Sequence, residues 1–324
     1  MHILCVGMMV YDVSLYPVTK NIFNLEKWDI NLPLVNTGGD ALNVATTLAK
    51  LDMSASVIGR IGEDINGKEI ISISNVLGVD TSGVIYDKQF GTAVSYMLIE
   101  ENGERHPLSY CDIYAALDDN DVTDEHIQKA DIVYFGSAFL MKKMDDGGTQ
   151  RLFKRAHQAG KITAMDAAMD SSHDLPEQVF KRLCPTLQET DIFIPSYSEA
   201  KVLTGQKDPI KIAECFKDLG IKIFGIKLGA EGCFLTDFNE CCTIESFKQA
   251  NPVDTTGAGD SFMGAFLCAY AKGWSMEQCG IFANAVASHN VAKVGATAGI
   301  PKFNDVIRFI DKQKSSVKIK RQPF

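Results

Sequence analysis

The sequence lacks a hydrophobic run long enough to cross a membrane. No apolar stretch of its 324 residues reaches the roughly 18 residues that a spanning helix needs. Residues 1–12, MHILCVGMMVYD, have neither a basic region nor a small-residue cleavage site, so they are expected to form a first β-strand rather than a signal peptide. These absences predict a cytoplasmic location and no membrane partner.

Paired cysteines and an excess of positive charge are also missing. The nine cysteines are odd in number and contain no Cys-x-x-Cys spacing, which favours reduced thiols over a disulfide framework. The formal net charge of −9 argues against nucleic acid as a partner, because phosphate backbones are bound by basic surfaces. The basic segment 312–321 is an exception, and we expect it to be a solvated terminal segment.

Two common nucleotide-binding fingerprints are incomplete. The segment Gly62–Lys68, GEDINGK, has Walker A spacing, but Glu69 follows where a serine or threonine would be needed to bind magnesium. The GAG of residues 257–259 is followed by Phe262 where the third glycine of a dinucleotide-binding loop would fall. The sequence therefore indicates neither a P-loop nor a dinucleotide site.

Short β-branched or apolar runs alternate with helical patterns along most of the chain. The clearest strands are expected at 130–135, 161–165, 191–195 and 221–228, with helices such as 148–159 between them. This alternation is typical of right-handed βαβ crossovers and predicts an α/β fold with a parallel sheet covered by helices on both faces. Ligands of such a sheet bind beyond the carboxyl ends of its strands.

Two segments, 12–34 and 90–114, lack helical periodicity and interrupt the alternation. The second is expected to form two strands joined at the turn 101–104. Together the two segments predict a small β-sheet, which we call the lid. An apolar sheet face needs covering, so the lid should close over a ligand or pair with a second subunit. The main domain would then comprise 1–11, 35–89 and 115–324.

The stretch Asp254–Phe266, DTTGAGDSFMGAF, combines a glycine turn, a carboxylate and a helix. Apolar residues recur at helical spacing from Ser261, so the turn entering this helix should consist of Gly257, Ala258 and Gly259. Their amides and the positive end of the helix dipole favour an anion such as phosphate. Asp260 would repel that anion, which makes sense if its carboxylate accepts a proton from an attacking hydroxyl. The alternative is that Asp260 only stabilises the first helical turn.

The same stretch resembles the C-terminal signature of the ribokinase-like (pfkB) family of carbohydrate kinases. A second stretch, Asn36–Leu51 (NTGGDALNVATTLAKL), resembles another signature of this family. In it Gly38, Gly39 and Asn43 fit the pattern Gly-Gly-x-x-x-Asn, which precedes a helix expected at 44–51. The resemblance covers nearly the whole chain. It implies a ribokinase-like sandwich with a lid that often joins two subunits, and transfer of the γ-phosphoryl group of ATP to a hydroxyl of a small polyol.

The resemblance also implies which residues bind the polyol: Asp12, Gly38, Gly39 and Asn43. Asp40 stands where many relatives have lysine or an apolar residue, and a second carboxylate would make a pre-phosphorylated sugar less welcome. Asp40 is equally suited to cap its helix. Asp166 and Asp170 either line the cleft or belong to a solvated loop.

For the nucleotide, the resemblance implies a glycine loop after the strand 221–228 and a helix at 275–293. The contacts would come from Lys227, Gly229, Gly232 and Asn284. Glu199 occupies the place of the acid in the family's Asn-x-x-Glu motif, which helps to hold Mg²⁺ through water, although Ser196 replaces the asparagine. A monovalent cation, K⁺, is implied at Asp254, Thr256 and Gly295, where it would offset negative charge near the phosphate.

These features favour ATP-dependent phosphorylation of a small neutral sugar, with Asp260 as the base and residues 257–259 as the anion site. One alternative is a nucleoside kinase, which uses the same machinery on a ribosyl hydroxyl, and the lid residues Tyr96, Met97 and Tyr110 leave that alternative open. Another is a sugar-sensing protein of the same fold without catalysis. The expected partners are the sugar, ATP and a second copy of the chain.

Overall fold

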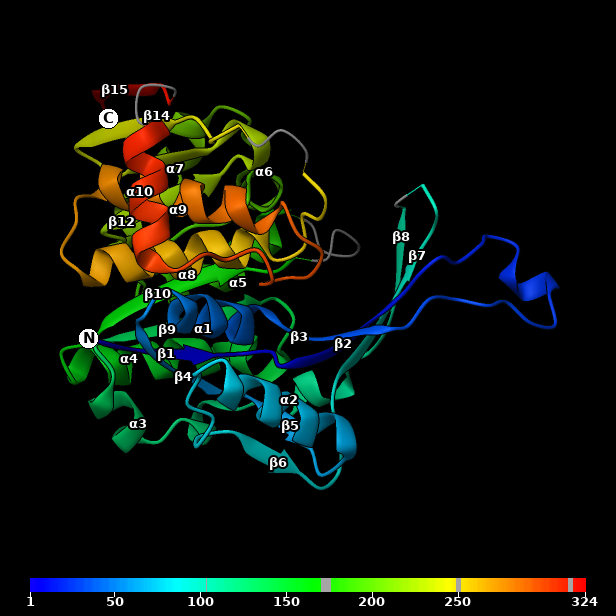
Figure 1. Ribbon diagram of the computed structural model, residues 1–324. Coiled ribbons are helices and arrows are strands. Elements are labelled where there is room, and N and C mark those ends of the chain that lie inside the picture. The colour runs from blue at the N-terminus through cyan, green and yellow to red at the C-terminus, as the bar shows by residue number, and fades with distance from the viewer. Residues whose placement is uncertain (103, 170–175, 249–251, 314–316) are drawn as a thin grey trace.

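The computed structural model describes residues 1–102, 104–169, 176–248, 252–313 and 317–324, and these form a nine-stranded central sheet flanked by helices (Figure 1). The strands from β12 to β4 are parallel, and three antiparallel strands extend one edge. In sheet order the strands are β15 (Ile319–Pro323), β14 (Glu240–Ile244), β13 (Cys233–Thr236), β12 (Ile223–Lys227), β11 (Ile192–Phe193), β10 (Ile162–Ala167), β9 (Ile132–Ala138), β1 (His2–Val6) and β4 (Ser54–Ile58).

The expected α/β architecture with a largely parallel sheet is confirmed. The strands expected at 130–135, 161–165 and 221–228 are present with shifted ends, and the one expected at 191–195 is only two residues long. The expectation of a solvated segment at 312–321 is wrong. Residues 319–323 form β15, which supplies hydrogen-bond partners to the edge of β14, and Arg321 pairs with Glu277.

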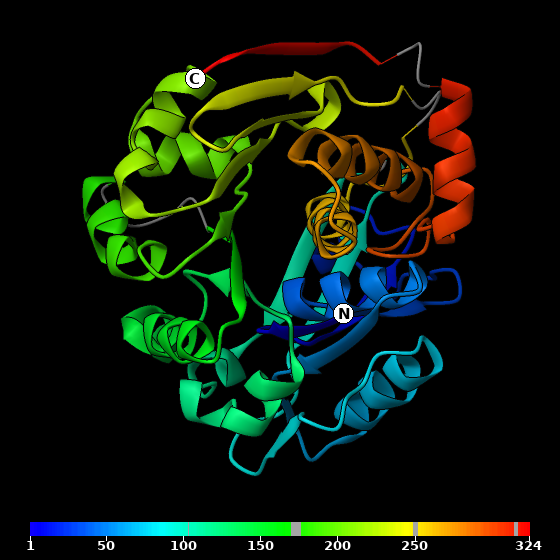
Figure 2. The same ribbon diagram turned by 90° about the vertical axis from the view of Figure 1, so that its left-hand side faces the viewer.

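Helices cover both faces of this sheet, as the end-on view in Figure 2 shows. One face is covered by α1 (Asp40–Lys50), α8 (Ala258–Ala271), α9 (Met276–Asn290) and α10 (Phe303–Gln313). The other face is covered by α3 (Asp124–Lys129), α4 (Thr149–Gln158), α5 (Pro176–Leu187), α6 (Tyr197–Thr204) and α7 (Pro209–Glu214). The alternation of side chains along β1 divides the core accordingly, since Ile3 and Cys5 join one cluster and Leu4 and Val6 the other.

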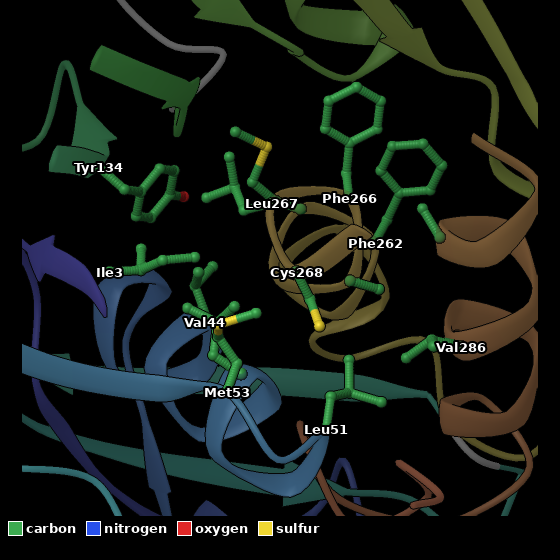
Figure 3. Packing of buried hydrophobic residues seen from close by; sticks show 14 of the residues in the cluster. Ile3, Val44, Leu51, Met53, Tyr134, Phe262, Phe266, Leu267, Cys268 and Val286 are labelled. Carbon is green, nitrogen blue, oxygen red and sulfur yellow. The ribbon is translucent and has the colours of Figure 1, made fainter. Parts of the chain in front are cut away.

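The helix pair α1 and α8 forms the centre of the first cluster. Figure 3 shows Val44 of α1 and Leu51, the residue after the end of α1, on the same side of α8 as Cys268. Gly264 makes this approach possible, because a Cβ at this position would lie 2.7 Å from the Cβ of Thr47. The close contact holds the N-terminal ends of the two helices near each other. Both helices begin earlier than expected, at residue 40 rather than 44 and at residue 258 rather than 261.

A smaller, separate sheet corresponds to the predicted lid. In sheet order its strands are β3 (Leu34–Gly38), β2 (Val10–Leu15), β7 (Val94–Ile99) and β8 (Arg105–Tyr110). The expected hairpin at 90–114 is therefore present, although residue 103 of its turn lies outside the described residues. Val10 pairs with Gly38, so the sheet extends beyond the expected limits of 12 and 34, because the β2–β3 ladder continues to the turn at Gly39. The division of the chain into two domains stays a prediction.

The connection from β2 to β3 projects away from the body and contains the 3₁₀ turn η1 (Ile22–Asn24) (Figure 1). The remaining elements, α2 (Ile65–Val76) and the two-stranded sheet of β5 (Arg60–Gly62) and β6 (Ile85–Asp87), lie near the base of the lid. Asp64 caps α2 by accepting the Gly67 N–H, which is a helix cap and not a phosphate loop. No helix in the described part of the chain is long and apolar enough to span a membrane.

Candidate active site

The candidate site lies where the N-terminal ends of α1 and α8 meet the carboxyl ends of central strands. Asp40 is the first residue of α1 and Asp260 the third of α8. Asp166 and Lys227 stand at the carboxyl ends of β10 and β12. Helix N-termini attract anions, and the carboxyl edge of a parallel sheet is where ligands bind, so the arrangement suits a phosphorylated ligand.

The predicted glycine turn is shorter than expected. Gly257 has a left-handed φ of 69°, and a Cβ there would lie 2.2 Å from the Ala296 oxygen, so the position requires glycine. The Ala258 N–H donates to the Thr255 oxygen at 3.2 Å and so is engaged within the turn. The first helical bond runs from the Ser261 N–H to the Gly257 oxygen. The amides of Gly259 and Asp260 precede it and are the ones that a ligand can use.

The carboxylate of Asp260 is held by a side chain from the other helix. Asn43 Nδ2 donates to Asp260 Oδ2 at 2.7 Å across 217 positions of sequence. The Asn43 side chain is buried, and its Oδ1 has no hydrogen-bond partner among the described residues. An unpaired buried acceptor is costly, so a donor that reached Asn43 Oδ1 would stabilise the site.

Lys227 lies inside the site rather than at its rim. Its ammonium group forms an ion pair with Asp166 Oδ2, and both side chains are largely buried. A Cβ at Gly259 would lie 3.3 Å from Lys227 Nζ, which places this ammonium directly beside the glycine turn. Asp166 thus lies beside the glycine turn, and its position in a cleft stays a prediction, whereas Asp170 lies outside the described residues.

Negative charge exceeds positive charge in this cluster, and the pKa values shift accordingly. Burial raises the pKa of Asp166 to about 7. Burial also raises the pKa of Asp260, partly opposed by the Asn43 hydrogen bond. Burial and then the charge of Asp260 raise the pKa of Asp40 well above its usual range. Burial lowers the pKa of Lys227, but Asp166 and Glu199 outweigh it, so its pKa rises and the ammonium stays charged.

The residues expected to bind the polyol gather on the lid side of α1. Gly39 has a φ of 91°, and a Cβ there would lie 2.4 Å from the Met8 oxygen. Asp12, in β2, packs against Gly38, because a Cβ added at Gly38 would lie only 1.9 Å from the Oδ2 atom of Asp12. Asp40 does not cap α1, since Gly39 is the N-cap and no side chain caps it. Instead Asp40 Oδ2 accepts the Ser137 N–H at 3.4 Å.

Glu199 belongs to a capping box at the start of α6. Glu199 Oε2 accepts the Ser196 N–H at 2.7 Å, and Ser196 Oγ accepts the Glu199 N–H at 3.3 Å. The Ser-x-x-Glu spacing is the ordinary signal of such a box, and it was readable from the sequence. Glu199 nevertheless acts electrostatically on Lys227 and Asp166, so its charge contributes to the site.

The three residues expected around K⁺ also come together. Asp254 Oδ1 accepts the Thr256 N–H and Oδ2 accepts the Gly295 N–H, each at 2.8 Å. A residue that sequence reasoning missed joins them: Arg105 of the lid donates from Nη1 to Asp254 Oδ1 at 2.5 Å and to Thr256 Oγ1 at 2.7 Å. Burial raises the pKa of Asp254, but these hydrogen bonds outweigh it and lower the pKa. No local sequence pattern indicates this contact, because Arg105 and Asp254 are 149 positions apart.

The residues expected to contact the nucleotide divide into two groups. The first group lies at the end of β12 and on the loop that follows: Lys227, Gly229 and Gly232. A Cβ added at Gly229 would meet no atom within 4 Å. Asn284 is different, because it is 3% exposed and its Nδ2 donates to the Ile244 oxygen at 3.2 Å. In this structure Asn284 makes a packing contact between α9 and β14, and its contact with adenine stays a prediction. Its polar side chain faces inward, which a helical pattern could not reveal.

Tyr134 is a second residue that sequence reasoning missed. Its ring is fully buried in β9, and its hydroxyl has no hydrogen-bond partner among the described residues. Burial, followed by the charges of Asp166 and Asp260, raises the pKa of this phenol. The sequence carries no signal for it, because a tyrosine in an apolar strand reads as a core residue.

Comparison with known proteins agrees with this geometry. A family model described as pfkB family carbohydrate kinase matches residues 1–302. Fructokinase-1 of Zea mays is 28% identical over 292 residues, covering 85% of this chain and 88% of that protein. An uncharacterized sugar kinase of Archaeoglobus fulgidus is 28% identical over 259 residues, covering 80% of this chain and 99% of that protein.

Solved structures show the same fold. A ribokinase from Thermotoga maritima has a TM-score of 0.81 and 26% identity, covering 95% of this chain and 99% of that chain. A ribokinase of Arabidopsis thaliana, complexed with ribose and ATP, has a TM-score of 0.78 and 25% identity, covering 95% of this chain and 98% of that chain. The fold and site thus define a sugar kinase of ribokinase-like architecture. The chain belongs to the pfkB family of carbohydrate kinases.

The environment of Asp12 predicts a pH-dependent effect on stability. Burial raises the pKa of Asp12 to about 7. Its unfolded value is about 4, so the folded protein binds the extra proton and Asp12 lowers stability as the pH rises from about 4 to about 7. Asp12→Asn should therefore raise the free energy of unfolding at pH 8 by roughly 2–3 kcal/mol more than at pH 5, measured by urea unfolding.

The matched control is Asp29→Asn, which neutralises an exposed carboxylate of the same lid. It should change the free energy of unfolding equally at both pH values. An equal gain for Asp12→Asn at pH 5 and pH 8 would contradict the raised pKa.

Proposed function

We propose that this carbohydrate kinase transfers the γ-phosphoryl group of ATP to a hydroxyl of a small neutral sugar. The observation that carries the proposal is the 2.7 Å hydrogen bond from Asn43 to Asp260 at the N-terminal end of α8. It fixes a carboxylate beside amides that suit a phosphate. The unpaired Oδ1 of Asn43 gives a sugar hydroxyl a second point of attachment.

In the proposed reaction the sugar oxygen attacks the γ-phosphorus while Asp260 accepts the hydroxyl proton. The bond from phosphorus to the bridging oxygen breaks, and ADP leaves with that oxygen. The glycine turn 257–259 stabilises charge on the moving phosphoryl group. The amides of Gly259 and of the adjoining Asp260 contribute most of this effect. Lys227 lies beside Gly259 and adds a fixed positive charge. The raised pKa of Asp260 suits a base at neutral pH.

A magnesium ion fits the donors of this site. Glu199 and Asp166 provide carboxylate oxygens near Lys227, and hard oxygen donors are what Mg²⁺ prefers. When bound, Mg²⁺ would neutralise charge on the ATP phosphates. The loop with Gly229 and Gly232 would approach the nucleotide. The Arabidopsis thaliana ribokinase, which is complexed with ribose and ATP, supports ATP as the donor.

The acceptor side favours a neutral sugar. Asp12 packs against Gly38, and Asp40 follows Gly39 at the start of α1, so any negative charge on these carboxyl groups would repel a phosphate already on the sugar. We expect turnover with ATP to be fastest on a neutral sugar when neutral sugars, hexose phosphates and nucleosides are compared at equal concentration. Faster turnover of a hexose phosphate would contradict the acceptor assignment, and faster turnover of a nucleoside would favour the alternative kinase.

The control for this panel is Asp260→Asn, which keeps the shape of the side chain and removes the base. It should fold normally and lose roughly 10²–10⁴ in kcat, the usual range for a general base. A folded variant that keeps near-full turnover would remove the role assigned to Asp260. Absence of turnover by the wild-type chain on every sugar would favour the sensing alternative.

We also propose that the chain forms a homodimer through the lid and works in the cytoplasm. The lid exposes large apolar side chains, with Phe23 91% and Leu32 88% exposed. Such a surface is stabilised by a second subunit. All nine cysteines are free thiols, which suits a reducing compartment.

Leu32→Asp should convert the dimer into a monomer, because it places a charge in the proposed contact. Sedimentation velocity measures the change. Val76→Asp is the matched control, since Val76 is 85% exposed on α2, outside the lid, and its substitution should leave the dimer intact. A wild-type chain that stays monomeric at micromolar concentration would contradict the proposal.

A further inference from the structure

Arg105 joins the lid to the segment that precedes the glycine turn. It is the first residue of β8, and its Nη1 donates both to Asp254 Oδ1 at 2.5 Å and to Thr256 Oγ1 at 2.7 Å. The Arg105 side chain is 27% exposed and that of Asp254 only 6%. The pair is therefore mostly withdrawn from solvent, where charge-assisted hydrogen bonds are strong.

Asp254 fixes the backbone on both sides of the turn. Its Oδ1 also accepts the Thr256 N–H, and its Oδ2 accepts the Gly295 N–H. Its own N–H donates to the Val291 oxygen at 3.1 Å. Because Gly257 packs on the Ala296 oxygen, the position of Asp254 determines how the turn rests on the 295–296 loop.

A monovalent ion does not fit beside this arrangement. The two oxygens that would face it, Asp254 Oδ1 and Thr256 Oγ1, already accept hydrogen bonds from one guanidinium nitrogen. A second cation at that point would be repelled by the first. A buried carboxylate does require a positive partner, and Arg105 provides one.

Ion pairs hold the tip of the hairpin that carries Arg105. Lys20 Nζ lies 2.9 Å from Glu104 Oε2, and His106 Nε2 lies 2.7 Å from Glu100 Oε1. The Lys20 contact ties the hairpin to the projecting β2–β3 connection, and the His106 contact joins the two strands of the hairpin. The position of Arg105 is thus linked to the position of the whole lid.

We propose that the Arg105 guanidinium takes the place of a monovalent cation at Asp254, and that it couples closure of the lid to the geometry of the glycine turn. Arg105 touches neither substrate nor reacting atoms in this account, so it is a positioning residue. The enzyme then needs no K⁺, because the lid carries the charge. Opening of the lid withdraws that charge and loosens the turn, so the phosphate site is complete only when the lid is closed.

The test measures kcat, Tm and hydrogen exchange in KCl and in tetramethylammonium chloride at equal ionic strength. The wild-type values should agree within about twofold in the two salts, whereas Arg105→Met should lose about tenfold or more in kcat in tetramethylammonium and regain part of it in KCl. Its Tm should fall by several degrees and rise on addition of K⁺. Exchange should quicken both in β7–β8 and in residues 252–258.

Two further variants sharpen the result. Arg105→Lys should keep activity without K⁺, because both hydrogen bonds come from one nitrogen that an ammonium can replace. Lys27→Met removes another lid cation, which pairs with Asp29 rather than Asp254, and should keep wild-type kcat in both salts. Only the kcat measurements rest on the proposed function, since Tm and exchange report on Arg105 even if no sugar is phosphorylated.

Three outcomes would overturn the inference. The first is a wild-type enzyme that gains tenfold or more in rate or several degrees in Tm from K⁺. The second is an Arg105→Met variant with wild-type Tm and kcat in tetramethylammonium. The third is faster exchange in the lid with unchanged exchange at residues 252–258, which would show that the two segments are not coupled.

Discussion

The contact between α1 and α8 is the constraint on which the rest of the site depends. Gly264 lets the two helices approach, so that a Cβ in its place would lie 2.7 Å from the Cβ of Thr47. One turn earlier on α1, the Asn43 side chain donates to Asp260. The Thr47 hydroxyl donates to the main-chain carbonyl oxygen of Asn43 at 2.7 Å. Two helix dipoles then converge on one point, where a carboxylate and free amides stand side by side. Packing in the core thereby sets the position of the Asp260 carboxylate relative to the amides of the glycine turn.

Charge at this point is balanced from two directions. Lys227 comes from the sheet and pairs with Asp166, so one positive charge stands among several carboxylates. Arg105 comes from the lid and pairs with Asp254 behind the turn. Burial, with a smaller effect from the charge of Glu199, keeps the pKa of Asp260 raised, and the remaining negative charge suits a divalent ion with a triphosphate. If the lid completes the site as proposed, ATP would be protected from water until the sugar is bound.

The sequence predicted the features that depend on local chemistry. Gly39 and Gly257 stand where the backbone needs positive φ, and the alternation of strands and helices predicted the sheet. It missed contacts between distant segments, such as Lys227 with Asp166, because register and topology decide them. The inward orientation of Asn284 could not be predicted either, because helical spacing does not say which polar residue faces inward. The spacing of Ser196 and Glu199 also predicts a capping box, and the structure contains one at the start of α6.

A double-mutant cycle on kcat with Asn43→Ala and Asp260→Ala tests the central claim most directly, namely that Asn43 acts by positioning the base. Asn43→Ala alone should lower kcat by about tenfold or more, since a hydrogen bond to a charged group is lost. In the Asp260→Ala background the same substitution should change kcat by less than about threefold, because the base is already absent. An equal loss in both backgrounds would contradict the account, because Asn43 would then act independently of Asp260.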